Sequence, residues 1–351
     1  MTTFHHALRR RFVFRSLAAW LAAGSMATAA VPAALAQEGS GAAAASRTPT
    51  GKVPAAVSVL SIVEHPSLDA LRDGLHDELK DAGYQDGKSL HWAYQSAQGN
   101  QGTAVQIARK FVGDRPDVIV PIATPAAQAV VSATHQIPVV YNAITDPIAA
   151  QIVKSMAPSG TNVTGVSDKL VADRQVAFIK RVVPDVKRVG IIYSPAEANS
   201  VSATREMKVA LEKQGISLVE VAAPRSIDVG QAAQRLVGKV DVIYTSNDNN
   251  VISAYESVIK VANAAKIPLI CADRSSVQRG ATGAMAIDYY RMGRQTGRMV
   301  LRILNGEKPG DIASETSDRL DITLNLDAAR RQGATLSPEL QAEASEIFGK
   351  P

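Results

Sequence analysis

Cysteine is almost absent from this chain of 351 residues, and Cys271 is the single example. One cysteine excludes an internal disulfide, so the fold must be held by its core alone. Aromatic residues make up only 5% of the sequence. After residue 36 no apolar stretch is long enough to span a bilayer. The sequence also lacks the G-x-S-x-G, H-E-x-x-H, Walker-type and G-x-G-x-x-G patterns, and its histidines lack metal-ligand spacing. We therefore expect no metal and no cofactor.

The positive charge is concentrated at the N-terminus. The formal net charge is +5, and residues 1–36 hold four arginines and no acidic residue. The remainder is close to neutral and has no long basic run, which argues against a nucleic-acid partner. The same segment sets a basic stretch (RRRFVFR) before an apolar one that ends in Ala34-Leu35-Ala36. This order is typical of a signal peptide cleaved after Ala36, and it predicts a periplasmic protein.

Two alternatives for this leader stay open. An N-terminal membrane anchor would also be basic and then apolar, although Pro32 and the cleavage pattern favour removal. Arg9 and Arg10 resemble a twin-arginine signal, so the export route, general secretion or twin-arginine, is undecided. A lipoprotein anchor would need a cysteine after the leader, and none is there.

Beyond the leader, one pattern recurs along the chain. Residues 37–52 are small, polar and patternless, which predicts a flexible tether. From Val53 on, Val- and Ile-rich runs alternate with amphipathic stretches, one of which Ser67 is expected to cap. The runs cover 55–63, 117–124, 138–144, 188–194, 241–246 and 267–273, with weaker ones at 89–95 and 217–222. Such alternation predicts an α/β fold with parallel sheets covered on both faces.

The alternation passes through two similar blocks, so we expect two Rossmann-like lobes. Lobe one is predicted to hold residues 53–165 plus 289–318, and lobe two residues 166–288 plus 319–340. PSGTNVTGVSD, at 158–168, is rich in small polar residues and is a candidate crossing between the lobes.

Polar residues gather where the predicted strands end. The apolar run that ends at Tyr244 breaks into Thr-Ser-Asn-Asp-Asn-Asn at 245–250. Ligands of open parallel sheets bind beyond the carboxyl ends of the strands, where helix N-termini attract anionic groups. Helix capping explains one such residue per turn, but not several in a row. The acids of these turns outnumber the bases Arg274 and His65: Glu64, Asp146, Glu197, Asp248, Asp273 and Asp288. An acidic cleft suits a small ligand with a cationic group.

Seven stretches together resemble a known family. They are IVEHPSLDALRDGL, IATPAAQAV, ITDPIAA, GTNVTGVSD, EANSV, KVDVIYTSNDNNV and IDYYRMGRQTGRMVLRILNGEKP. In this order, over residues 53–335, they are similar to the extracytoplasmic solute-binding components of ABC importers, in the branch with tryptophan- and tyrosine-associated members. The resemblance implies a type I periplasmic-binding-protein fold that closes over a small ligand, with a permease and an ATPase as partners.

The matched motifs also imply ligand-binding residues. From lobe one these are Ser61, Glu64, Thr124, Thr145 and Asp146. From lobe two or the hinge they are Asn199, Ser200, Asn247, Asp248, Asp273 and Asp288. Thr245-Ser246 stands where family members often have a proline, so the contacts of this loop stay open.

We therefore expect a monomeric, non-enzymatic receptor that delivers a small ligand to a permease. The residues favour an amino acid by its cationic group, and the resemblance alone suggests an aromatic one. A first alternative is a two-lobed sensory domain that feeds a membrane receptor; a transcription regulator would need an N-terminal helix-turn-helix instead of the leader. A second alternative is a secreted α/β hydrolase that uses Glu64 and His65 as an acid-base pair, although no partner nucleophile is recognisable.

Overall fold

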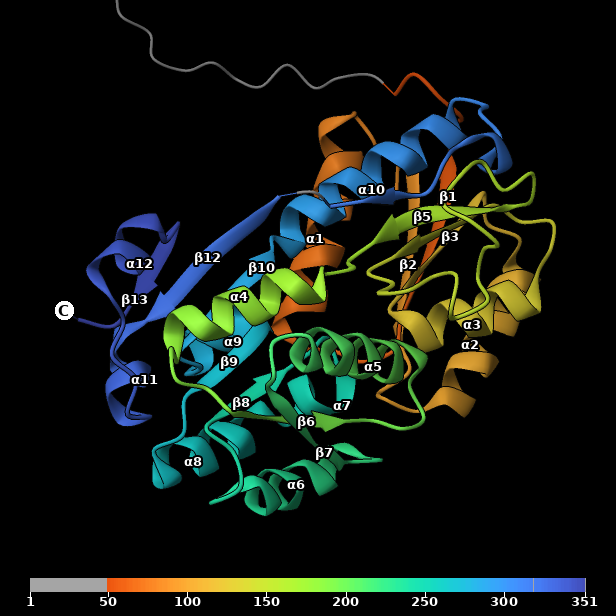
Figure 1. Cartoon of the computed structure of the whole chain (residues 1–351). Helices are drawn as coiled ribbons and strands as arrows, with labels where there is room; N and C mark the ends of the chain where they lie inside the picture. The colour runs from red at the N-terminus through yellow and green to blue at the C-terminus, as the bar shows by residue number, and fades with distance from the viewer. Residues whose placement is uncertain (1–48, 318, 351) are drawn as a thin grey trace, which may run out of the picture. The chain divides into compact units, whose positions relative to one another are not determined.

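The computed structural model describes residues 49–317 and 319–350. The predicted signal peptide and residues 37–48 of the predicted tether lie outside these ranges. Within them, none of the helices combines the length and apolar character needed to cross a bilayer. The described strands form two sheets, and each sheet with its helices is called a lobe below (Figure 1).

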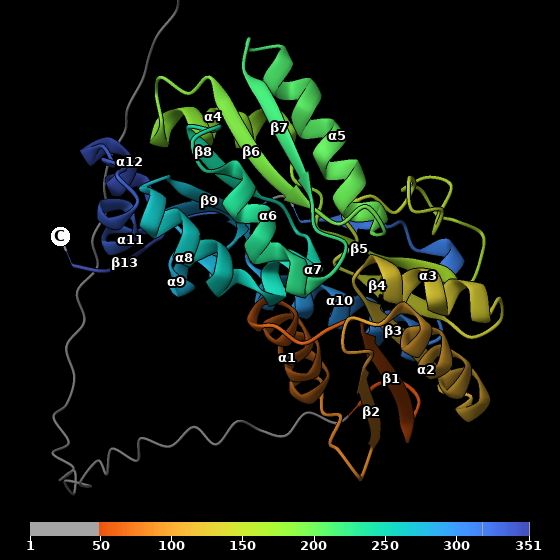
Figure 2. The ribbon, with the colours of Figure 1, turned by 90° about the horizontal axis from the view of Figure 1, so that it is seen from below.

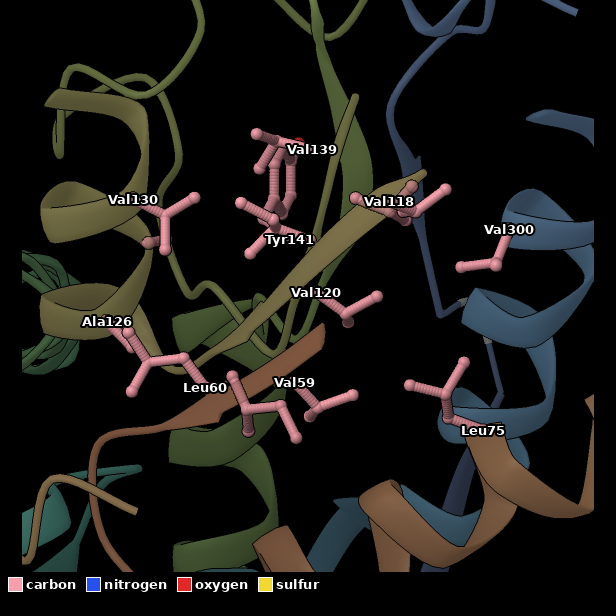
Figure 3. Packing of buried hydrophobic residues seen from close by; sticks show 14 of the residues in the cluster. Val59, Leu60, Leu75, Val118, Val120, Ala126, Val130, Val139, Tyr141 and Val300 are labelled. Carbon is pink, nitrogen blue, oxygen red and sulfur yellow. The ribbon is translucent and has the colours of Figure 1, made fainter. Parts of the chain in front are cut away.

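Sheet one is parallel throughout its described strands, in the order β11-β5-β4-β3-β1-β2. Its strands are β1 (Ala55–Ser61), β2 (Leu90–Ser96), β3 (Val118–Ile122), β4 (Val139–Asn142), β5 (Val163–Ser167) and β11 (Glu315–Thr316). Its helices are α1 (Pro66–Asp81), α2 (Gln101–Asp114), α3 (Thr124–Ala133) and α10 (Tyr289–Leu304). Figure 3 shows Leu75 of α1 and Val300 of α10 on one side of the sheet, with Ala126 and Val130 of α3 on the other.

Sheet two has the order β13-β12-β10-β9-β8-β6-β7 among the described strands. These are β6 (Arg188–Tyr193), β7 (Ser217–Ala222), β8 (Val242–Thr245), β9 (Leu269–Asp273), β10 (Gly283–Ile287), β12 (Leu320–Asn325) and β13 (Glu346–Phe348). Its helices are α4 (Ala172–Val182), α5 (Ala198–Glu212), α6 (Val229–Leu236), α7 (Asn249–Ser253), α8 (Tyr255–Ala265), α9 (Arg274–Arg279), α11 (Leu326–Arg331) and α12 (Pro338–Glu343). Two separate apolar clusters pack against it, one with residues of α4 and α5 and one with residues of α6 and α8. Figure 2 labels these four helices around sheet two.

The predicted α/β fold with two sheet-centred lobes is confirmed, and every predicted apolar run contains a strand. Sheet two is not wholly parallel, because β12 runs antiparallel to β10. The prediction that Ser67 caps a helix beginning near Leu68 is wrong, because the helix begins two residues earlier, at Pro66. His65 is the cap: its ring Nδ1 accepts a hydrogen bond from the Leu68 amide at 3.4 Å. Proline suits the first helical position, where no amide donor is needed.

The chain passes between the two sheets at three points in the described structure. It leaves sheet one after β5 to enter α4, returns after β10 to form α10, and leaves again between β11 and β12. The segment at 158–168 therefore contains a strand of sheet one, β5, and ends at the first of these crossings.

Candidate functional site

A narrow cavity lies where the strand ends of the two lobes meet. With the open solvent at its mouths its empty space is about 270 Å³, and its enclosed part has room for about one water molecule. Lobe one contributes the turns after β1, β3, β4 and β5, and lobe two contributes the start of α5 and the turn between β8 and α7. The residues that line it are His65, Leu68, Ala123, Thr124, Ala143, Thr145, Asp168, Asn199, Asn247, Asn249, Ile252 and Tyr289.

The Asp168 carboxylate ties the cavity together. Asp168 follows β5 at the first crossing and is 2% exposed. Its oxygens accept hydrogen bonds from Thr145 Oγ1 at 2.9 Å, from Asn247 Nδ2 at 2.9 Å and from the Tyr289 hydroxyl at 2.7 Å. Burial raises the pKa of Asp168, and these three donors oppose that rise. The carboxylate therefore links lobe one, lobe two and the start of α10.

Two asparagines of lobe two present unpartnered oxygens. Asn247 gives its Nδ2 to Asp168, and Asn199 gives its Nδ2 to the Asn247 carbonyl at 2.9 Å and to Glu197 at 3.2 Å. Within the described structure, the Oδ1 atoms of both are buried and have no hydrogen-bond partner. A buried polar atom without a partner is unfavourable. Because both residues line the cavity, a donor on a ligand would satisfy these oxygens.

The lobe-one side of the cavity offers donors. Because His65 Nδ1 accepts the Leu68 amide, the neutral ring carries its proton on Nε2, and Nε2 has no partner among the described residues. Burial lowers the pKa of His65 to about 4, a change that the nearby Asp273 carboxylate opposes, so the ring is neutral at physiological pH. Thr124 Oγ1 is likewise buried without a described partner. Thr124 starts α3, for which the described residues provide no side-chain cap.

The backbone of the cavity wall is locally strained. Ala123 has a φ of 72° and Ala143 a φ of 55°, and both line the cavity. Non-glycine residues in this region cost about 1–3 kcal/mol each and concentrate at functional sites. Their small side chains also leave the space beyond these strand ends open.

An apolar pocket adjoins the cavity and shares Thr145 and Asn247 with it. Its empty space, with its mouth, is about 430 Å³. Its apolar wall consists of Leu170, Ala172, Ala203, Met207, Tyr244 and Ala272. Thr145 and Asn247 therefore border both the polar cavity and this pocket, whose other lining residues include Asp146, Lys169 and Glu206.

The structure brings five of the residues named from sequence to this region. Thr124, Thr145, Asn199 and Asn247 line the cavity, and Asp146 lines the apolar pocket. Asp146 accepts a hydrogen bond from Ser202 at 3.1 Å and lies 3.5 Å from Lys169 Nζ. These neighbours help to lower its pKa against the opposing effect of burial.

The other six do not line the cavity. Ser61 donates to the Val63 carbonyl, and Glu64 is exposed and accepts from Tyr94 and Gln98. Within lobe two, Ser200 donates to Asp248, and Asp248 caps α7. Asp273 caps α9 and also accepts a hydrogen bond from Ser67 of lobe one at 2.8 Å. Asp288 caps α10 beside a different surface groove.

Sequence reasoning did not select His65, Asp168, Asn249 or Tyr289 as ligand contacts, although all four line the cavity. Asn249 belongs to the polar run after β8, and Asp168 directly follows β5. A rule that scores the residue after each strand, β5 included, would have found Asp168. The Glu64–His65 acid-base pair of the hydrolase alternative is not assembled among the described residues: Glu64 accepts from Tyr94 and Gln98, and no hydrogen bond joins it to His65. Across the described residues, no cluster of His, Cys, Asp and Glu could hold a metal ion.

Comparisons with known proteins agree on one family. The model of the family described as ABC transporter substrate binding protein matches residues 56–348. A tyrosine-binding protein from Clostridioides difficile (strain R20291) is 39% identical over 274 residues, which is 78% of this chain and 79% of that protein.

Two solved structures are also similar. An ABC domain from Streptococcus pneumonia in complex with L-Trp is 34% identical, has a TM-score of 0.81, and aligns over 84% of this chain and 99% of its own. A ligand-free, open substrate binding protein from Clostridium difficile is 37% identical, with a TM-score of 0.65 over 84% of this chain and 100% of its own. The family match, the two-lobed fold and the interlobe cavity lead to one conclusion: this chain belongs to the substrate-binding proteins of ABC transporters.

Proposed function

We propose that this chain is the periplasmic receptor of an ABC importer and binds an aromatic amino acid in the interlobe cavity. The proposal rests on the buried groups without hydrogen-bond partners, which are donors in lobe one and acceptors in lobe two. Lobe one offers the donors His65 Nε2 and Thr124 Oγ1, and lobe two offers the acceptors Asn199 Oδ1 and Asn247 Oδ1. A zwitterion fits this arrangement, with its carboxylate on the donors and its ammonium on the acceptors.

The N-terminus of α3 adds to the carboxylate side. Its first-turn amides carry partial positive charge, and no acidic side chain occupies the first turn. Asp168 adds to the ammonium side, since its buried carboxylate lies behind Asn247. Together they give the cavity one end of positive and one end of negative potential.

The apolar pocket supports an aromatic side chain. Tyr244 and Met207 offer a ring and a polarisable sulfur, both of which pack well against aromatic rings. Since this pocket shares Thr145 and Asn247 with the cavity, a ligand held by its charged groups can extend its side chain into it. The similar tyrosine-binding protein and the similar L-Trp complex support the same ligand class.

The relative TM-scores support a closed arrangement of the lobes. The chain matches the L-Trp complex at 0.81 and the ligand-free open structure at 0.65, although the sequence identities are nearly equal. A ligand that contacts both lobes stabilises the closed state, because only there can it satisfy groups on both sides. We infer that the closed, ligand-loaded monomer is what a permease and its ATPase recognise.

We infer binding without turnover. A His65 ring with a pKa near 4 is a weak general base at neutral pH, and Glu64 faces away from it toward Tyr94 and Gln98. The signal peptide predicted for residues 1–36 supports a periplasmic location.

Isothermal titration calorimetry with matched ligands tests the proposal. L-tyrosine or L-tryptophan should bind. Tyramine lacks the carboxylate and 3-(4-hydroxyphenyl)propanoate lacks the ammonium, so each should bind at least about tenfold more weakly than L-tyrosine. The reason is that a hydrogen bond to a charged group contributes about 1.5–3 kcal/mol. Equal affinity for L-tyrosine and either truncated ligand would contradict the zwitterion site. The absence of binding by both amino acids would contradict the proposed ligand class.

A further inference from the structure

Glu197 is a buried carboxylate one layer behind the cavity. It precedes α5 and is 6% exposed. Its Oε2 accepts hydrogen bonds from Asn249 Nδ2 at 2.6 Å, from Asn199 Nδ2 at 3.2 Å and from the Asn249 amide at 3.4 Å. Both asparagines line the cavity. One carboxylate therefore holds two of the side chains that face the ligand.

Holding the nitrogen of an asparagine amide also fixes its oxygen. The amide has one donor end and one acceptor end, so a carboxylate that binds Nδ2 turns Oδ1 the other way. Asn199 shows the result: its Nδ2 binds Glu197 and the Asn247 carbonyl, and its Oδ1 is buried without a described partner. Asp168 has the same relation to Asn247 on the neighbouring turn.

The charge of Glu197 is not balanced by a cation. Among the described residues, no lysine, arginine or histidine forms a salt bridge with it. Asp248 lies close to it at the start of α7, Arg225 lines the adjoining pocket with it, and His65 lines the cavity with its two asparagine partners. Arg225 is engaged by Asp228 at 2.9 Å, and His65 is neutral. Burial, with the Asp248 carboxylate adding to it, raises the pKa of Glu197 to about 7.

We propose that Glu197 is the positioning residue of the ammonium subsite and that its ionisation makes ligand affinity depend on pH near neutrality. The proposal rests on the proposed function, since it requires a cationic group on the ligand. An ionised Glu197 orients Asn199 and Asn249 and attracts the ammonium through them, whereas a protonated Glu197 loses the charge and an acceptor site. The ligand's ammonium should in turn favour the ionised form, so affinity should fall as the pH drops through about 7.

The test measures the Kd of L-tyrosine and L-tryptophan between about pH 5.5 and 8 by calorimetry. If the ligand lowers the pKa of Glu197 by about one unit, the wild-type affinity falls about tenfold across this range. Glu197→Gln can keep the hydrogen bonds through its carbonyl oxygen but cannot ionise. We expect its affinity to be nearly independent of pH and close to the low-pH value of the wild type. Glu197→Ala frees both asparagines and should bind more weakly than Glu197→Gln at every pH.

Glu220→Gln is the matched control, because Glu220 is an exposed acid on β7 of the same lobe and pairs with Lys208. It should keep the wild-type pH profile. A flat wild-type profile overturns the inference without any variant, as does a Glu197→Gln protein that keeps the wild-type slope. If the wild type binds neither amino acid at any pH, the proposed function fails and this inference fails with it.

Discussion

The contact between α1 and α10 gives the sharpest test of the packing. Gly293 of α10 lies against α1, and an added Cβ there would be 2.1 Å from the Leu71 carbonyl oxygen. Gly74 of α1 is equally tight, 2.1 Å from the Tyr290 carbonyl oxygen. These obstacles are backbone atoms, which cannot move aside by changing a rotamer. The Gly293→Ala substitution must therefore push the two helices apart.

The expected magnitude follows from two opposing effects. Overpacking a core costs about 1–3 kcal/mol, and a backbone clash belongs at the upper end of that range. Alanine gains about 1 kcal/mol over glycine in a helix interior. The net loss of unfolding free energy for Gly293→Ala should therefore be about 2 kcal/mol.

Gly113→Ala is the matched control, because Gly113 lies in α2, is exposed, and an added Cβ would meet nothing within 4 Å. That variant should gain up to about 1 kcal/mol from helix propensity alone. Urea denaturation followed by far-UV circular dichroism measures both. Equal stability of the two variants would refute the close backbone approach. Because α1 begins beside His65 and α10 at Tyr289, Gly293→Ala should also weaken ligand binding.

Three further substitutions test the site. His65→Asn keeps a capping side chain on α1 but loses the Nε2 donor. The affinity for L-tyrosine should therefore fall about fivefold, as for one hydrogen bond, with little change in melting temperature. An unchanged Kd would show that His65 does not contact the ligand. Thr124→Val removes a buried hydroxyl without a described partner. Calorimetry should show weaker binding of L-tyrosine, and thermal unfolding should show a free energy of unfolding raised by up to about 1 kcal/mol. Tighter binding would contradict the assignment of Thr124 as a ligand donor. Asp288→Asn can still cap α10 and should leave the Kd unchanged, since Asp288 lies outside the cavity; a tenfold loss of affinity would contradict that placement.

The fold was largely predictable because buried parallel strands have a strong local signature. DVIVPIAT at 117–124 is a continuous apolar run after a proline, and it contains β3 with every residue buried. β5 was harder to recognise, since VTGVS mixes polar and small residues with only two valines. Its burial comes from β4 and β11 on either side, and β11 lies about 150 residues further along the chain. No local pattern encodes that pairing.

The site was only partly predictable because the sequence does not reveal which way a polar side chain points. Asp248 and Asp273 have the composition of ligand contacts, but each turns back to cap its own helix. Caps and ligand contacts use the same residue types at the same helix ends. Asp168 shows the opposite case. Its partners Thr145, Asn247 and Tyr289 lie 23, 79 and 121 positions away, so its role exists only in the folded chain.

The hydrogen bond between Asp168 and Tyr289 joins two of the three segments that cross between the lobes. A rotation that separates the lobes bends these segments but need not part them from each other. Asp168, Tyr289 and Thr145 can thus stay assembled while Asn247 swings away with lobe two. An amino acid that binds the open state would then contact the Asp168 carboxylate next to the interlobe crossings first. Closure of the lobes would add the Asn247 side chain to the site.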